Sequence, residues 1–125
     1  MLEVEVIGEA LPGERVREAC ALAVASAGLD EAHLAVEFVD AARIAELNAE
    51  HRGTEGPTDV LSFPVDGRGP AAGPRELGDV VICPECTEDL LEAVVHGVLH
   101  LTGMDHETDD GEMLALQAEI RSWLN

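Results

Sequence analysis

Three histidines in the sequence have a spacing that suits a metal ion. They lie in the stretch His96-Gly-Val-Leu-His100-Leu-Thr-Gly-Met-Asp-His106. The segment from Leu90 to Leu101 is apolar nearly all round, which is typical of a buried helix. His96 and His100 are four residues apart and therefore share one face of that helix. Because a buried imidazole needs a partner for each nitrogen, a metal ion that binds both rings is the simplest way to satisfy them.

A turn after this helix brings a third ligand within reach. Gly103 can end the helix, and a segment that folds back beside the last turn would place His106 next to the other two histidines. Three neutral nitrogen ligands leave a fourth position for water, as in catalytic rather than structural zinc sites. The pattern therefore predicts one catalytic metal ion, with Zn²⁺ first among the divalent transition metals that fit.

The spacing His-x3-His-x5-His is also that of the metzincin peptidase signature. In that signature the first histidine is followed by a glutamate that acts as the general base, whereas this chain has Gly97. The sequence therefore disfavours a peptidase, and another general base, or hydroxide bound to the metal, must do the work of the glutamate.

Alternating and helical patterns of apolar residues predict the elements that position these histidines. We expect a mixed four-stranded sheet covered by helices, in an α+β single domain of residues 1–125, with the metal site at the end of a central buried helix. The expected strands are 2–7, 33–39, 58–63 and 78–83. The first two expected helices are 14–27 and 41–50, and a third is capped by Thr87 and ends near Leu101. The last helix is expected to start at Asp109 or Asp110 and to pack Met113, Leu116, Ile120 and Trp123.

Two loops complete this prediction. The segment Arg52–Pro57 is expected to be a loop, and Asp66–Glu76, with three glycines and two prolines, is expected to be a mobile loop. The strand at 78–83 is apolar on both faces, which indicates a place in the interior of the sheet.

The charge of the chain is strongly negative. It has 26 acidic and 7 basic residues, all of the latter arginine, for a net charge of −19. Proteins that bind bare nucleic acid usually have the opposite balance. We also expect a soluble, cytoplasmic protein with no membrane partner, because the N-terminal residues lack the pattern of a signal peptide and the longest apolar stretch, Leu90–Leu101, is too short to span a bilayer.

The three cysteines do not suggest a disulfide framework. Cys83-Pro-Glu-Cys86 has the spacing of a redox pair or half of a zinc knuckle, but no second pair exists. We expect Cys83 to end a buried strand and Cys86 to begin a helix as a small apolar residue.

A second set of residues carries a resemblance to a known family. The blocks are Leu47-Asn-x3-Arg52-Gly, Pro57-Thr-Asp-Val-Leu-Ser-Phe-Pro64, Leu77-Gly-Asp-Val-Val-Ile-Cys83 and the histidine block. In this order they closely resemble the YbeY family of bacterial endoribonucleases and ribosomal RNA maturation factors. The resemblance covers most of the chain.

The resemblance implies roles for four residues. His96, His100 and His106 match the zinc ligands of the family, and Arg52 matches its functional arginine. The chemistry of Arg52 agrees, because a guanidinium can hold a phosphate through two hydrogen bonds and stabilise charge in a transition state.

Other residues of these blocks have two interpretations each. Thr58, Asp59 and Ser62 could act at the site or could satisfy backbone groups of a strand and turn. Asp105 could orient an imidazole or shape the turn before His106. His33 and His51 lack ligand spacing, and we interpret them as ordinary residues.

The resemblance implies a single-strand-specific, zinc-dependent endoribonuclease that matures the 3′ end of 16S ribosomal RNA and takes part in ribosome quality control. Its partners would be ribosomal RNA and the small ribosomal subunit, and because of the charge we expect a ribosomal protein to present the RNA. Two alternatives stay open: a non-enzymatic ribosome assembly factor with a structural metal, and a metallohydrolase of another substrate.

Overall fold

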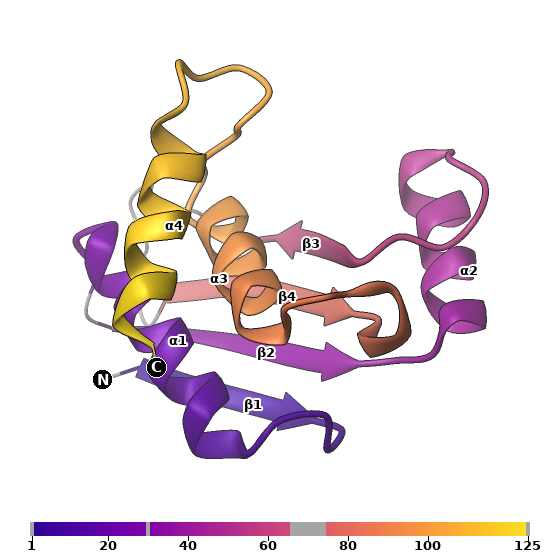
Figure 1. The fold of residues 1–125 in the computed structure, drawn as a ribbon, viewed down its shortest axis with the longest axis horizontal. Coiled ribbons are helices and arrows are strands. Elements are labelled where there is room, and N and C mark those ends of the chain that lie inside the picture. Colours follow the sequence, from indigo (N-terminus) through magenta and orange to yellow (C-terminus); the bar gives the residue numbers. More distant parts are fainter. Residues whose placement is uncertain (1, 30, 66–74, 125) are drawn as a thin grey trace.

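The computed structural model describes residues 2–29, 31–65 and 75–124, which form a four-stranded mixed sheet with helices on both faces (Figure 1). The strands stand in the order β1-β2-β4-β3, and only the β3–β4 pair is antiparallel. The elements in chain order are β1 (Leu2–Ile7), α1 (Gly13–Ser26), β2 (Ala32–Phe38), α2 (Ala41–Arg52), β3 (Val60–Pro64), β4 (Arg75–Ile82), a 3₁₀ turn (Pro84–Cys86), α3 (Leu90–Leu101) and α4 (Glu112–Trp123). The predicted α+β class and mixed four-stranded sheet are confirmed.

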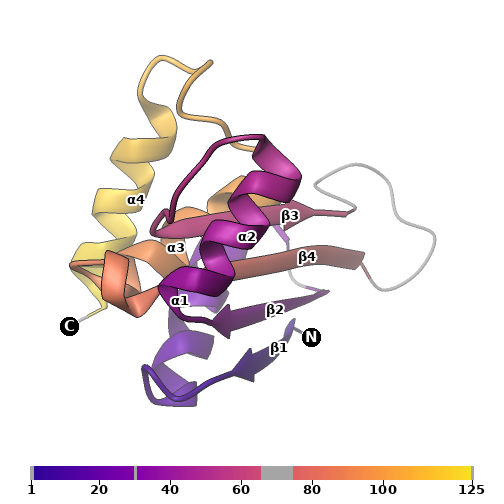
Figure 2. The ribbon, with the colours of Figure 1, turned by 90° about the vertical axis from the view of Figure 1, so that its right-hand side faces the viewer.

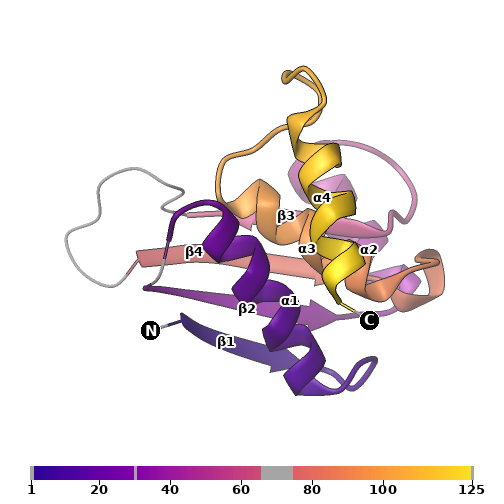
Figure 3. The same cartoon turned by 60° about the vertical axis from the view of Figure 1, so that its left-hand side comes forward.

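The two faces of the sheet carry separate apolar clusters. Alternation along β4 sends Val80 and Ile82 into the larger cluster, beneath α1, α3 and α4, and sends Val81 into a smaller one beneath α2. Figure 2 shows α2 in front of the sheet with α3 and α4 behind it, and Figure 3 shows α1 on the side opposite α2. The pairing of β4 with β2 on one side and β3 on the other confirms that it lies inside the sheet.

Helix α3 is the central helix, because it contacts α1, α4, β3 and β4. Eight of its twelve residues are buried, and they leave His96 and His100 half-buried on its remaining face. The buried residues are Leu91, Ala93, Val94, Val95, Gly97, Val98, Leu99 and Leu101.

Several predicted boundaries are wrong. Arg52 is the last residue of α2 rather than part of a loop, because Gly53 accepts the left-handed conformation (φ +68°) that ends the helix. The carboxylate of Asp89, rather than Thr87, caps α3 by accepting from the backbone N–H of Glu92, and the Thr87 hydroxyl instead donates to the Cys83 carbonyl.

The last two elements also differ from their predictions. Helix α4 begins at Glu112, and Asp109 precedes it, accepting from the backbone N–H groups of Gly111 and Met113. Trp123 does not pack inward; it is 53% exposed. Strand β4 begins at Arg75, so the end of the predicted Asp66–Glu76 loop is strand, and residues 66–74 lie outside the described residues.

All three cysteines are free. Cys83 is buried directly after β4, as predicted, and Cys20 is buried in the larger cluster, where burial raises the pKa of its thiol to about 12. Cys86 is exposed at the end of the 3₁₀ turn, so its predicted role as a small apolar helix residue is wrong. None of the described helices has the length and apolar character needed to cross a membrane.

Candidate metal centre and cleft

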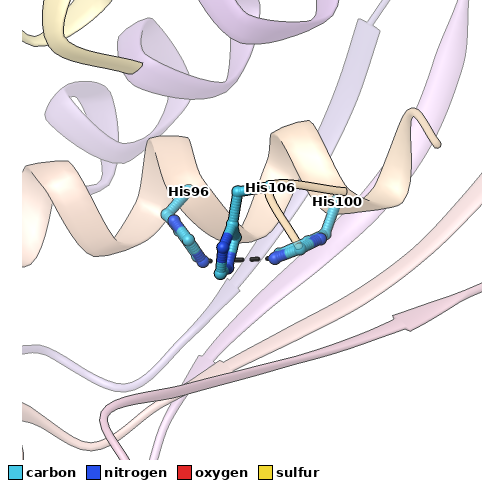
Figure 4. A group of neighbouring side chains, drawn as sticks. All are labelled: His96, His100 and His106. Atoms are coloured by element: carbon cyan, nitrogen blue, oxygen red, sulfur yellow. Dashed lines mark hydrogen bonds between the residues drawn. The ribbon is translucent and has the colours of Figure 1, made fainter. Parts of the chain in front are cut away.

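The first two histidines project from one face of α3 toward each other. The Nε2 atoms of His96 and His100 are 3.2 Å apart, and the ring centroids are separated by 4.7 Å (Figure 4). Most other residues of α3 are buried in the larger apolar cluster, so the two rings are held on a rigid element.

The turn after α3 brings the third histidine to this pair. Gly103 adopts φ +102°, and the backbone N–H of Met104 donates to the carbonyl of Leu99, which folds the chain back on the last turn of the helix. His106 then lies with its ring centroid 5.1 Å from that of His96 and 5.3 Å from that of His100. One ligand atom of each histidine lies within 4.8 Å of the others.

The hydrogen bonds at Nδ1 of His96 and Nδ1 of His100 are compatible with a metal ion bound between the two Nε2 atoms. Nδ1 of His100 lies 2.9 Å from the carbonyl of Met104, which can only accept, so Nδ1 donates and Nε2 keeps its lone pair. Nδ1 of His96 lies 2.6 Å from Oε1 of Gln117 on α4. When Nδ1 of His96 donates to this oxygen, both Nε2 lone pairs face each other, and a cation between them resolves the repulsion.

The protonation of His100 agrees with a ligand role. Burial lowers the pKa of its imidazole, and the nearby His96 lowers it further. The neutral form, which binds metal, is therefore favoured. Three histidines without an additional ligand among the described residues match the donor set of a catalytic zinc site.

Position 97 shows why this site lacks the peptidase glutamate. A Cβ on Gly97 would lie 2.4 Å from Cγ1 of Val80, and the carbonyl of Gly97 accepts from the hydroxyl of Ser62 at 2.9 Å. The residue after the first histidine therefore faces the sheet, where a glutamate side chain would collide with β4 instead of reaching the cleft.

Arg52 lies on the opposite wall of the cleft that contains the histidines. This cleft, of about 680 Å³, is lined by the end of α2, the whole of β3 with the two residues before it, one face of α3 and the turn that follows α3. Arg52 is exposed and is the only arginine among its described lining residues. The structure thus brings all four predicted site residues to one cleft.

The remaining candidates have structural contacts. Asp59 accepts from the backbone N–H of Val60, Ser62 ties β3 to α3 through Gly97, and Asp105 accepts from the N–H of Glu107 in the turn. Within the described part of the chain, the Thr58 hydroxyl donates a long hydrogen bond of 3.4 Å to Asp59. These contacts agree with the backbone and turn interpretation of Asp59, Ser62 and Asp105, although Thr58, Asp59, Ser62 and Asp105 also line the cleft.

Two features of the site are not predicted by the sequence. The first is Gln117, which contacts His96 from outside the cleft, because no local pattern links it to a histidine 21 residues earlier. His51, which was interpreted as ordinary, lines the cleft beside Arg52 and contacts the ring of Phe63 edge-on, with centroids 4.9 Å apart. His33 is ordinary, as predicted: it pairs with Glu76 at 2.7 Å outside the cleft.

The fold and this cleft define a small α+β protein with a three-histidine candidate metal centre. The family model described as endoribonuclease YbeY matches residues 9–125. The chain is 43% identical to the endoribonuclease YbeY of Rubrobacter xylanophilus, over 94% of this chain and 92% of that protein, and 40% identical to that of Salinispora tropica, over 98% and 96%.

The chain therefore belongs to the endoribonuclease YbeY family, and the resemblance predicted from its motifs is confirmed. The solution structure of TM1509 from Thermotoga maritima is similar in fold, with a TM-score of 0.60 and 27% sequence identity over 97% of this chain and 88% of that one.

Proposed function

We propose that this protein is a zinc-dependent endoribonuclease that cleaves single-stranded RNA and acts in ribosomal RNA processing, at the 3′ end of 16S RNA, and in ribosome quality control. The observation that carries the proposal is the position of Arg52 and the three histidines in one cleft of a YbeY-family protein. We further propose that residues 1–125 act as one domain in the cytoplasm.

Zinc is proposed because all three candidate ligands are imidazole nitrogens. Magnesium and calcium prefer oxygen ligands, whereas zinc binds histidine in four-coordinate sites. A bound divalent ion would supply Lewis acidity, which polarises phosphoryl oxygens and favours ionisation of water.

The charges of the cleft make RNA binding depend on that ion. Its described lining carries one arginine, Arg52, against three carboxylates: Asp59, Asp105 and Glu107. Without metal, the lining of the cleft repels phosphate, whereas a divalent ion offsets the excess of negative charge. Arg52 then has one task, which is to hold a phosphate oxygen pair opposite the imidazoles.

The aromatic pair beside Arg52 supports a single-stranded substrate. His51 and Phe63 meet edge-on, so part of each ring face stays open, and the side chain of His51 is 51% exposed. An unpaired base can stack on such a ring, whereas a base inside a duplex cannot. We propose that a nucleotide next to the cleaved bond stacks on His51.

The net charge of −19 supports a protein partner for substrate delivery. Most of the surface repels bare RNA, so affinity for RNA alone should be weak and sensitive to salt. We propose that a ribosomal protein of the small subunit presents the RNA to the cleft. A structural metal in a non-enzymatic assembly factor is less well supported, since no fourth protein ligand joins the histidines among the described residues.

The test is cleavage of a single-stranded RNA and of its duplex by zinc-loaded protein. We expect the wild type to cleave the single strand and His100→Ala to lose both the metal and that activity. Arg52→Ala should keep the metal and cleave roughly 10- to 100-fold less efficiently. His33→Ala is the matched control, because His33 lies outside the cleft. Equal slow cleavage by wild type and His100→Ala would refute the nuclease proposal.

A further inference from the structure

We infer that Gln117 is a positioning residue of the metal centre: its amide oxygen fixes the ring of His96 so that Nε2 points at the metal. The inference rests on the proposed metal site but not on RNA cleavage. It adds helix α4, which provides no candidate ligand, to the elements that build the site.

The contact is short and comes from a separate helix. Oε1 of Gln117 lies 2.6 Å from Nδ1 of His96, and both residues are half-buried between α3 and α4. A hydrogen bond of this length restricts the rotation of the imidazole about its Cβ–Cγ bond. Among the three histidines, His96 and His100 each have such a contact on the nitrogen away from the other ring.

The two contacts differ in what they demand of their partner. The acceptor for His100 is the backbone carbonyl of Met104, so it is independent of residue type. The acceptor for His96 is a side-chain amide, which a substitution can remove or exchange. Because an amide oxygen accepts and its nitrogen donates, only the orientation with Oε1 toward Nδ1 leaves the Nε2 of His96 free for a metal.

Helix α4 is held in place by a second polar contact one turn later. Nε of Arg121 donates to Oδ2 of Asp89 at 2.8 Å, and Asp89 caps the start of α3. Gln117 and Arg121 are four residues apart on α4, so both reach α3 from the same face. The apolar anchors Met113 and Ile120 are fully buried, which keeps α4 in register without Gln117.

The experiment measures zinc affinity by competition with a chelator in the wild type, Gln117→Leu and Gln117→Glu. Leucine removes the acceptor and keeps much of the volume, while glutamate can only accept. Removal of an outer hydrogen-bond partner typically weakens metal binding by roughly 10- to 100-fold. We expect a loss of that size in Gln117→Leu and an affinity at or above that of the wild type in Gln117→Glu.

A second readout separates positioning from general stability. In the zinc-loaded wild type, NMR should show a slowly exchanging Nδ1 proton on His96, which Gln117→Glu keeps and Gln117→Leu loses. Glu119→Gln, an exposed change on the same helix, is the control and should alter neither quantity. Unchanged zinc affinity and proton exchange in Gln117→Leu, or weaker binding in Gln117→Glu, would overturn the inference, whereas a wild type that binds no zinc would instead refute the metal site.

Discussion

The two walls of the cleft are built differently. On the metal wall, formed by α3 and the turn after it, the half-buried His96 and His100 have their outer nitrogens held by Gln117 and by the backbone of Met104. On the opposite wall, here called the substrate wall, His51 and Arg52 are exposed in the last turn of α2, which Gly53 caps. The metal wall is preorganised, as metal ligation requires, whereas on the substrate wall the long, exposed side chain of Arg52 can adapt to a substrate.

This difference predicts that substitutions on the metal wall change metal affinity and stability, whereas those on the substrate wall change only the binding and cleavage of substrate.

Loss of a histidine should abolish metal-dependent stabilisation. With zinc at about 100 times its dissociation constant, the wild type should gain roughly 2.7 kcal/mol in free energy of unfolding. His100→Ala should gain almost none, because it loses a ligand and not merely the partner of one. Chemical denaturation with and without zinc measures this gain, and an equal gain in both proteins would mean that zinc binds elsewhere.

The packing behind the metal wall should tolerate no side chain at position 97. Gly97→Ala would place a Cβ 2.4 Å from Cγ1 of the buried Val80, and overpacking of this kind costs about 1–3 kcal/mol. In the double variant with Val80→Ala the two losses should not add, because the second change makes room for the first. Denaturation curves of the four proteins test this; additive losses would show that the contact is not the cause.

On the substrate wall, Arg52→Ala should leave zinc affinity unchanged. Loss of the guanidinium should lower the efficiency of RNA cleavage by roughly 10- to 100-fold, the range expected when hydrogen bonds to a charged group are removed. Arg52→Lys should recover only part, since lysine keeps the charge but not the two-pronged geometry. A change in zinc affinity in either variant would contradict the separation of the two walls.

A smaller effect is expected from His51, the other exposed residue of this wall. Stacking of a base on an aromatic ring contributes about 1–3 kcal/mol, and the open position of His51 favours the lower end. His51→Ala should therefore raise the KM for single-stranded RNA by roughly fivefold and leave kcat unchanged. His51→Phe should restore the KM, and failure to do so would argue for a role of the imidazole charge instead of stacking.

The sequence predicted the metal wall better than the substrate wall, for a physical reason. The spacing of His96 and His100 follows directly from the helical repeat, and Gly103 marks the turn that returns His106. The contact from Gln117 depends on how α4 packs across α3, which no local pattern encodes. The place of Arg52 was predicted from its motif, but its helical conformation was not, because the end of α2 is set by the left-handed conformation of Gly53.

Trp123 illustrates the same limit. Its spacing from Met113 and Ile120 fits a helical apolar face, yet Leu124 is buried in its place. The inner face of α4 is chosen by the angle at which the helix crosses α3, and periodicity alone leaves that angle open.

The ion pair between Asp89 and Arg121 provides the smallest and most specific test of how α4 supports the metal wall. Burial acts to raise the pKa of Asp89, but the hydrogen bonds from Arg121 and from the backbone of α3, together with the arginine charge, outweigh it and lower the pKa below its usual value. A lowered pKa stabilises the fold above the pKa of the unfolded state, and this contribution disappears as the pH falls through the folded pKa.

Asp89→Asn keeps the helix cap and removes the charge. We expect it to lower the free energy of unfolding by about 0.2–1 kcal/mol at neutral pH, as for other partly exposed pairs. The difference from the wild type should vanish below the folded pKa of Asp89, and Arg121→Gln should show the same pH dependence. If Asp89→Asn also weakens zinc binding, the ion pair transmits its effect through α4 to Gln117; if zinc affinity is unchanged, the apolar anchors of α4 are enough to hold that contact.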